Sequence, residues 1–236
     1  MIELDDNQSV DNDSPAHTDP SPPIRYGREE KRSRKIEEIN NAAAAVFIRD
    51  GYAEFSARKV AKEMGISLSN LQHYCGNTDN LCVQMVKDKL EYYIHRFEEV
   101  YRDKSLLPIE RLAVAIRENV IATYDPYATR LFFQMAALAT QDDRIKEVMV
   151  NQYEQFLSGL RSLVAEINPL LTHDQVATYS GLIATQIEGN FFYQWQPSFT
   201  PALREQMLEE FIVIWQRMLS SAVLTPNILG SHVEDL

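Results

Sequence analysis

Cysteine is nearly absent from the chain, and this excludes two kinds of small-protein scaffold. Only two of the 236 residues are cysteine. Cys75 and Cys82 are spaced for neither a disulfide framework nor a metal site, so small apolar residues are the simpler interpretation of both. We therefore expect no metal, and nothing in the sequence indicates a cofactor.

Long apolar runs are missing as well. No run approaches the roughly 20 residues that a membrane-spanning helix needs, and the N-terminus lacks the basic-then-apolar pattern of a secretory signal. The apolar content of 45% is ordinary for a folded protein with a core. These features predict a soluble, cytoplasmic protein that does not contact a membrane.

Patterns typical of β-strands and of enzymes are also lacking. No alternating β-branched run lies between turn residues, so an all-α fold is expected. The chain has no glycine-rich phosphate loop, no Gly-x-Ser-x-Gly and no paired Glu-x-x-His of a di-iron bundle. We expect no catalytic residues and no enzymatic activity.

Positive charge is scarce, with a formal net charge of −11, but its distribution is uneven. Residues 1–24 hold six acids and no Lys or Arg, and we interpret them as a disordered acidic tail. Residues 25–80 hold ten Lys and Arg against eight acids, whereas residues 81–236 hold thirteen against twenty. The basic-leaning segment opens with the cluster Arg25, Arg28, Lys31, Arg32, Arg34 and Lys35. Such a cluster is usually a solvated face, but it also suits the phosphates of DNA.

What the chain does contain is a helix-turn-helix pattern over residues 52–81. Ser56 is a good cap for a first short helix, and Gly65 ends it. Ser67 or Ser69 can cap a second short helix with a polar face. In a helix-turn-helix this second helix enters the major groove of DNA. From the pattern alone, a helical hairpin in another all-α protein is the alternative.

The pattern sits within a chain that is predicted to be helical almost throughout. Caps and first-turn prolines predict nine helices, three of them in a domain over 25–77 and six in a domain over 78–224. A C-terminal tail over 225–236 completes the expected organisation. Outside the helix-turn-helix, the expected helices cover about 28–50, 79–103 (capped by Thr78), 108–124, 142–167, 173–193 and 201–221. One more is expected to open at Asp125-Pro126 and to carry Leu131, Phe132, Met135 and Leu138.

Residues 30–81 resemble the TetR/AcrR family of bacterial transcriptional regulators. The match covers the first helix, a Phe-x-x-x-Gly-Tyr joint ending at Tyr52, the two-helix reader and the passage into a fourth helix. The resemblance implies a homodimer with a DNA-binding head on helices one to three and a ligand-binding body on helices four to nine. It also implies that the last two helices form the dimer interface and that ligand tilts helix four.

Two residues depart from the family pattern where the head meets the body. Cys75 stands where the family usually has phenylalanine, which is expected to loosen the packing there. Thr78 stands where the family usually has a phosphate-binding lysine. Its loss removes one charge-assisted hydrogen bond and predicts weaker or redistributed contacts with the DNA backbone.

The DNA-contacting candidates lie on and around the second short helix. Glutamine and asparagine can pair bidentately with adenine, and a helix N-terminus can hold a phosphate. Exposed polar side chains without a partner are the alternative. The candidates are Arg32, Ser56, Arg58, Lys59, Ser67, Ser69, Asn70, Gln72, His73, Tyr74 and Thr78.

The ligand-binding candidates come from the aromatic residues of the larger domain. Most of these must pack the core, but ligand cavities are themselves mainly apolar with a few polar groups. His95 or Glu188 can add a polar anchor. The candidates for the cavity wall are Tyr93, Phe97, Phe132, Met135, Phe156, Gln186 and Phe192.

Small residues recur every four positions in the penultimate helix. Because glycine costs a helix about 1 kcal/mol relative to alanine, two on one face indicate close helix approach. The alternative is a single-chain core. The candidates for a dimer interface are Ala177, Gly181, Thr185, Gly189, Phe211, Ile214, Trp215 and Met218.

These features predict a dimeric DNA-binding transcriptional regulator that responds to a ligand. The expected partners are double-stranded DNA with a palindromic operator, a second copy of the chain and a small-molecule effector. Repression relieved by the small molecule is the favoured mode. An activator, a constitutive regulator without inducer, and a helical small-molecule-binding protein that retains the head are the alternatives.

Overall fold

The computed structural model describes residues 27–221, so the tails expected at 1–24 and 225–236 lie outside the described residues. Between residues 27 and 221 the chain forms nine α-helices, a short 3-10 turn and no strand, which confirms the prediction of an all-α fold. None of these helices combines the length and the apolar character needed to cross a membrane.

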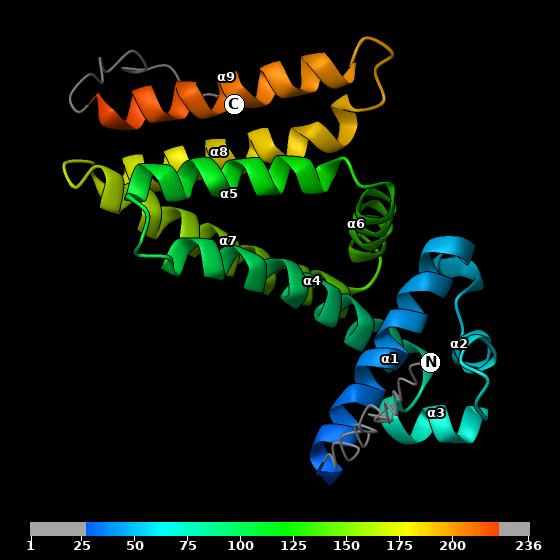
Figure 1. Cartoon of the computed structure of the whole chain (residues 1–236). Coiled ribbons are helices and arrows are strands. Elements are labelled where there is room, and N and C mark those ends of the chain that lie inside the picture. Colours follow the sequence, from blue (N-terminus) through cyan, green and yellow to red (C-terminus); the bar gives the residue numbers. More distant parts are fainter. Residues whose placement is uncertain (1–26, 222–236) are drawn as a thin grey trace, which may run out of the picture.

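The first three helices form a small unit that we call the head (Figure 1). It comprises α1 (Arg28–Asp50), the 3-10 turn η1 (Tyr52–Glu54), α2 (Ala57–Glu63) and α3 (Leu68–Cys75). The Oγ atoms of Ser56 and Ser67 accept hydrogen bonds from backbone N–H groups three residues on, at 3.3 and 3.1 Å. Gly65 has φ +64° in the turn between the two short helices, a conformation that favours glycine. The expected helix-turn-helix is therefore formed, with Ser67 as its second cap.

The remaining six helices form what we call the body. They are α4 (Thr78–Arg102), α5 (Pro108–Thr123), α6 (Pro126–Ala139), α7 (Asp143–Ile167), α8 (His173–Tyr193) and α9 (Pro201–Ser220). In Figure 1, α4 runs from the head into the body, α6 crosses the end that faces the head, and α8 and α9 lie farthest from it. The domain boundary expected between residues 77 and 78 stays a prediction.

The start of α4 differs from the sequence expectation. The cap is Asn77, whose Oδ1 accepts a hydrogen bond from the N–H of Asn80 at 2.8 Å, and not Thr78. Thr78 is the first helical residue, and its Oγ1 accepts a hydrogen bond from the N–H of Ala57 at 3.2 Å. Its hydroxyl therefore ties the start of α4 to the start of α2.

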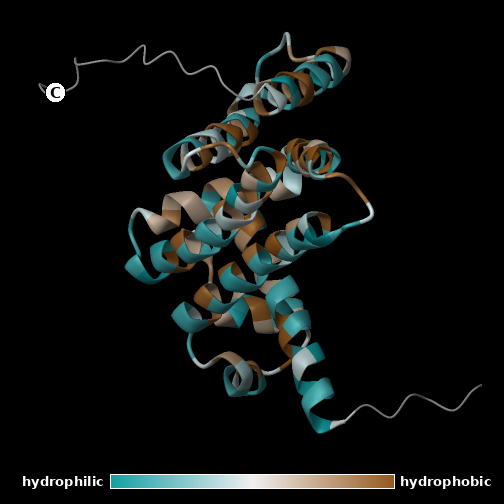
Figure 2. Ribbon diagram, turned by 90° about the vertical axis from the view of Figure 1, so that its left-hand side faces the viewer, coloured by the Kyte–Doolittle hydropathy of each residue, from teal (hydrophilic) through white to brown (hydrophobic). Residues whose placement is uncertain are grey.

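Two hydrophobic clusters organise the described residues. The first joins the three head helices to the start of α4, to α6 and to the start of α7, with Phe47, Leu81 and Met135 among its buried members. The second joins α5, α7, α8 and α9. Figure 2 shows the matching amphipathic pattern, with hydrophobic faces turned inward and a hydrophilic free end on α1. The head thus shares its core with part of the body.

Polar contacts reinforce the junction between α1 and α4. Asn40 is buried, and its Nδ2 donates to Oδ1 of Asp88 at 2.8 Å while its Oδ1 accepts from Nε2 of Gln84 at 2.9 Å. From α6, Nε2 of Gln134 donates to the carbonyl of Ile48 at 3.2 Å. Two of the body helices that reach the head, α4 and α6, are therefore hydrogen-bonded to α1.

One glycine allows a close approach between α4 and α7. A Cβ added at Gly159 would lie 2.2 Å from Cε2 of Tyr101, so the ring of Tyr101 occupies the space of a side chain. The same ring stacks near Phe97 with centroids 6.3 Å apart. Gly159 therefore fixes how the far end of α4 lies against α7.

Candidate functional site

Helix α3 presents a polar face to solvent. Ser69, Asn70, Gln72 and His73 are exposed, whereas Leu71 is buried in the head core. Cys75 is also buried, and its Sγ donates to the carbonyl of Leu71 at 3.2 Å. Its thiol fills the position inside the head where a phenylalanine was expected. The four exposed side chains leave one surface of α3 available to a partner.

Tyr74 and Arg32 bring α1 next to α3. The half-buried ring of Tyr74 lies edge-on to His73, with centroids 5.4 Å apart. The guanidinium of Arg32 lies 5.6 Å from the centre of the Tyr74 ring, a cation–π geometry. The free end of α1 therefore adds a positive charge beside the polar face of α3.

Three of the hydroxyl candidates already accept a backbone hydrogen bond. Ser56 and Ser67 cap their helices, and Thr78 accepts from Ala57. Each of these hydroxyls can still donate its proton and accept one more hydrogen bond. Their positions near α2 and α3 agree with the expectation, but the fold itself gives them a structural role.

The two basic candidates of α2 differ. The ammonium of Lys59 pairs with Asp50 and Glu54, both at 3.2 Å, and the hydrogen bond to Asp50 is the main cause that raises the pKa of Lys59. Arg58 is exposed and makes no ion pair with any residue from 27 to 221. Arg58 is thus the better placed of the two to meet a phosphate.

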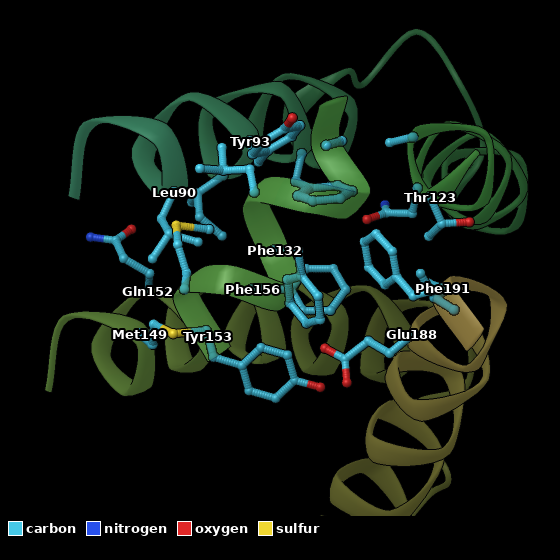
Figure 3. Close-up of a pocket in the computed structure, with 18 of the residues that line it drawn as sticks. Leu90, Tyr93, Thr123, Phe132, Met149, Gln152, Tyr153, Phe156, Glu188 and Phe191 are labelled. Atoms are coloured by element: carbon cyan, nitrogen blue, oxygen red, sulfur yellow. The ribbon is translucent and has the colours of Figure 1, made fainter. Parts of the chain in front are cut away.

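A cavity of about 470 Å³ lies between α4, α5, α6, α7 and α8 (Figure 3). Its wall is mostly apolar and aromatic. Phe191 stacks face to face on Phe132, with centroids 4.4 Å apart and planes 3° apart. Five of the predicted residues line the cavity: Tyr93, Phe97, Phe132, Met135 and Phe156.

Two predicted cavity residues lie elsewhere. Gln186 points toward α9, and its Oε1 accepts from Nε1 of Trp215 at 2.7 Å. Phe192 is 60% exposed and packs edge-on to Phe133. Ile187, Glu188 and Phe191 line the cavity instead. Phe191 lies four residues after Ile187 and three after Glu188, so the three share one face of α8, and this spacing could have identified that face from the sequence.

Of the two expected polar anchors, Glu188 lines the cavity and His95 does not. Figure 3 shows the hydroxyl of Tyr153 and the carboxylate of Glu188 turned toward each other. Burial raises the pKa of the Glu188 carboxyl, and the Tyr153 hydrogen bond opposes the shift. Burial also raises the pKa of Tyr153. His95 is exposed outside the cavity and lies 4.0 Å from Glu98.

A second polar group of the cavity has no partner. Gln152 is buried, and its Oε1 has no hydrogen-bond partner among the described residues. Figure 3 places Gln152 on the side of the cavity away from Glu188. The cavity therefore has a carboxylate at one side and an unsatisfied acceptor at the other.

The outer face of α8 and α9 exposes apolar side chains. Leu182, Ile214 and Met218 are 48%, 45% and 45% exposed. The predicted small residues lie on α8 of this face, with Ala177, Thr185 and Gly189 exposed and Gly181 half-buried. A Cβ added at either glycine would meet nothing within 4 Å, so packing inside the chain does not require glycine there.

Two predicted interface residues belong to the core of their own chain. Phe211 and Trp215 are 6% and 3% exposed and lie in the second hydrophobic cluster. Helix α9 is apolar over much of its girth, so the sequence did not decide which side faces inward. Ile214 and Met218 are on the outer side, whereas Phe211 and Trp215 are turned inward.

Two curated proteins of Bacillus subtilis (strain 168) are similar in sequence to part of the chain. The HTH-type transcriptional regulator PksA is 29% identical over 140 residues, which are 59% of this chain and 65% of PksA. The fatty acid metabolism regulator protein is 28% identical over 85 residues, which are 36% of this chain and 43% of that protein. The chain thus spans less than two thirds of the length of either relative. No model of a protein family matches it.

Solved structures share the fold over most of the chain. A regulator from Mesorhizobium loti assigned to the TetR family covers 80% of this chain and 98% of its own, with 18% identity and a TM-score of 0.66. A transcriptional regulator from Saccharomonospora viridis in complex with choline covers 77% and 96%, with 14% identity and a TM-score of 0.64. FadR from Bacillus subtilis in complex with stearoyl-CoA covers 80% and 99%, with 18% identity and a TM-score of 0.59.

The similarities agree with the architecture of the chain. A three-helix head with a helix-turn-helix is joined to a six-helix body, as the resemblance of residues 30–81 predicted. The chain therefore has the fold of these transcriptional regulators, and part of its sequence is similar to two curated regulators.

Proposed function

We propose that the chain is a DNA-binding repressor that acts as a homodimer and is released from a palindromic operator by a small molecule. The observation that carries the proposal is the polar face of α3, which is exposed while the other face of the helix is buried in the head core. A surface helix stabilised in this way suits insertion into a major groove, with its side chains against base edges.

Within the head, base contacts and phosphate contacts are proposed for different residues. Asn70 and Gln72 can read adenine bidentately, while Arg32 and Arg58 supply charge for phosphates. Tyr74 is held beside Arg32 and can donate its hydroxyl to a phosphate. Thr78 offers no charge, so the backbone contacts depend more on the two arginines.

The outer face of α8 and α9 supports a homodimer. Exposed apolar side chains on two adjacent helices need a cover, and the two glycines have no role inside the chain. A second copy that presents the same face would cover both the exposed apolar side chains and the two glycines. The two heads would then reach successive major grooves about 34–36 Å apart.

Regulation by a small molecule follows from the shared wall between cavity and head. Leu131 and Met135 of α6 line the cavity and also belong to the head core. A ligand that favours another position of α6 or α4 would displace α1 through these contacts. Its differential affinity for the two positions sets the size of the response. Proteins of this fold hold ligands as different as choline and stearoyl-CoA, so the fold leaves the ligand's charge open.

The test is titration of the full-length protein against the DNA upstream of its own gene. We expect tight binding that weakens steeply with salt, because phosphate contacts release counterions. Scrambled DNA of the same length should bind more weakly at moderate salt. Equal affinity for both fragments would overturn the specific regulator, and a flat salt dependence would favour a small-molecule-binding protein that retains the head.

A further inference from the structure

The charged residues of the cavity wall are all acidic. Glu154 and Glu188 line the cavity, and no Lys, Arg or His from the described part of the chain does. The carboxylate of Glu154 is paired with Arg161 outside the wall. Glu188 is paired with no cationic side chain between residues 27 and 221, so its charge is not balanced locally.

Glu188 is held in an environment that disfavours an isolated charge. It is half-buried, and its carboxylate faces the hydroxyl of Tyr153 in the cavity (Figure 3). A carboxylate can accept several hydrogen bonds, so most of its acceptor capacity remains unused. Taking such a group out of water without a counter-charge costs free energy, and a cation beside it would offset that cost.

Aromatic rings surround the space in front of Glu188. Six of them line the cavity: Tyr93, Phe97, Phe132, Tyr153, Phe156 and Phe191. The faces of aromatic rings attract cations, and the attraction is stronger where water is excluded. The wall therefore combines a large apolar surface with two separate features that favour positive charge.

An anionic ligand would find no basic residue in the cavity and no unpaired one in the groove beside it. That groove shares Ile94, Phe97 and Phe156 with the cavity and contains three basic residues. Arg111 and Lys104 both pair with Glu166, at 2.6 and 3.1 Å, and Arg102 pairs with Glu98 at 3.0 Å. A carboxylate or phosphate in the groove would have to displace one of these pairs.

We propose that the cavity binds a lipophilic cation, an apolar molecule with one amine or quaternary ammonium group that lies beside Glu188. The volume of about 470 Å³ suits a molecule of drug size. On the opposite side, the unpartnered Oε1 of Gln152 would accept a hydrogen bond from a hydroxyl or amide at the far end of the ligand. The inference rests on the proposed function only for the effect on DNA; ligand binding can be measured without it.

The test compares three amphiphiles with the same chain and different heads. Decyltrimethylammonium, 1-decanol and decanoate are titrated into the full-length protein by calorimetry, below their micelle concentrations. We expect the cation to bind about tenfold more tightly than the alcohol, the size of one charge-assisted contact, and the anion to bind most weakly. Decanoate binding as tightly as the cation, or no binding of the cation, would overturn the proposal.

Matched variants locate the preference. Glu188→Gln keeps an acceptor for Tyr153 but removes the charge, so it should lose the tenfold preference for the cation and keep its affinity for decanol. Glu147→Gln makes the same change at an exposed glutamate of α7 that does not line the cavity, and should leave all three affinities unchanged. A Glu188→Gln protein that retains the preference would overturn the role of Glu188. If Glu188→Gln fails to fold, the ranking of the three ligands on the unaltered protein still decides the proposal.

Operator binding separates this inference from the proposed function. The same cation is added to the protein–DNA complex at a concentration that saturates the cavity. Release of the DNA would support both the proposed ligand class and the regulation of DNA binding through the cavity. Saturation of the cavity with the complex intact would leave the ligand class established and overturn regulation through the cavity.

Discussion

Gln72 and Ser67 lie five positions apart on one short segment, but the fold uses them differently. Ser67 accepts the N–H of Asn70 and so holds the start of α3, whereas the exposed side chain of Gln72 has no partner within the described chain. Ser67 stabilises the start of α3 and the proposed base contact falls to Gln72, so single substitutions should separate the two effects.

Ser67→Ala should lower the free energy of unfolding by about 1 kcal/mol, because the cap is lost. Gln72→Ala should leave stability unchanged and remove about 1–3 kcal/mol of base preference at one position of the operator. Chemical denaturation and binding to a set of single-base operator variants measure the two effects. A Gln72→Ala protein that is weakened equally on every sequence would show that Gln72 does not read a base.

Glu188 should also make ligand binding depend on pH. Burial raises the pKa of Glu188, so its carboxyl is still partly protonated at pH values just above the ordinary pKa of a glutamate. Protonation removes the attraction for a cation. The other titratable groups of the wall are Tyr93, Tyr153 and Glu154. Burial raises the pKa of both tyrosines, and Glu154 is paired with Arg161. Affinity for decyltrimethylammonium should therefore rise with pH as Glu188 ionises, and Glu188→Gln should flatten the profile.

The same shift has a consequence for stability, whose sign is opposite to that of a salt-bridged carboxylate. A carboxyl with a raised pKa in the folded state binds its proton more tightly there than in the unfolded chain. Between the ordinary pKa of a glutamate and the raised pKa of Glu188, the free energy of unfolding should fall as pH rises. Without ligand, Glu188→Gln should reduce this slope in unfolding experiments across that range. An unchanged slope would show that Glu188 titrates normally.

At the scale of the helices, hydrogen bonds between polar side chains hold α1 to α4, and no pattern in the sequence predicted them. Asn40 is 2% exposed and is hydrogen-bonded to both Gln84 and Asp88 of α4. Asn40→Ala should cost about 1–3 kcal/mol, because buried partners are left unsatisfied. It should also reduce the change in operator affinity caused by ligand. Asn41→Ala is the control, since Asn41 is exposed and its contact to Lys89 lies at the surface.

The packing of α4 on α7 depends on Gly159. In an open helix position, glycine to alanine gains about 1 kcal/mol, but here the new methyl group meets the ring of Tyr101. We expect Gly159→Ala to destabilise the protein by about 1–3 kcal/mol, the usual cost of overpacking. Thermal unfolding measures the effect. A stabilised Gly159→Ala protein would mean that Tyr101 moves away freely.

At the scale of the whole molecule, α8 and α9 expose apolar side chains on an outer face that nothing in the described chain covers. Ile214→Glu should leave the fold of one chain intact, because Ile214 is 45% exposed, but it should break the proposed homodimer. Leu107→Glu is the matched control, since Leu107 is 63% exposed and lies away from this face. Sedimentation analysis reads out the oligomeric state, and an Ile214→Glu protein that stays dimeric would place the interface elsewhere.

Much of the architecture was accessible from the sequence because helix ends have local chemical signals. Ser56, Ser67 and Asp125-Pro126 act over a few residues and were sufficient to place their helices. The side of α9 that faces inward was not accessible, because apolar residues cover several faces and only packing chooses among them. On α8 the prediction was wrong by one position, because Phe191 and not Phe192 lines the cavity. The cap of α4 was assigned one residue late because Asn77 and Thr78 are both good caps.

The wall that α6 provides for both the cavity and the head core has a consequence for the DNA itself. Binding free energies at two coupled sites are reciprocal. If a cation in the cavity weakens operator affinity by some factor, the operator must weaken cation affinity by the same factor, through the same contacts of Leu131 and Met135. The operator would then lower the affinity of the cavity for its ligand, so excess operator DNA should release bound ligand from the protein.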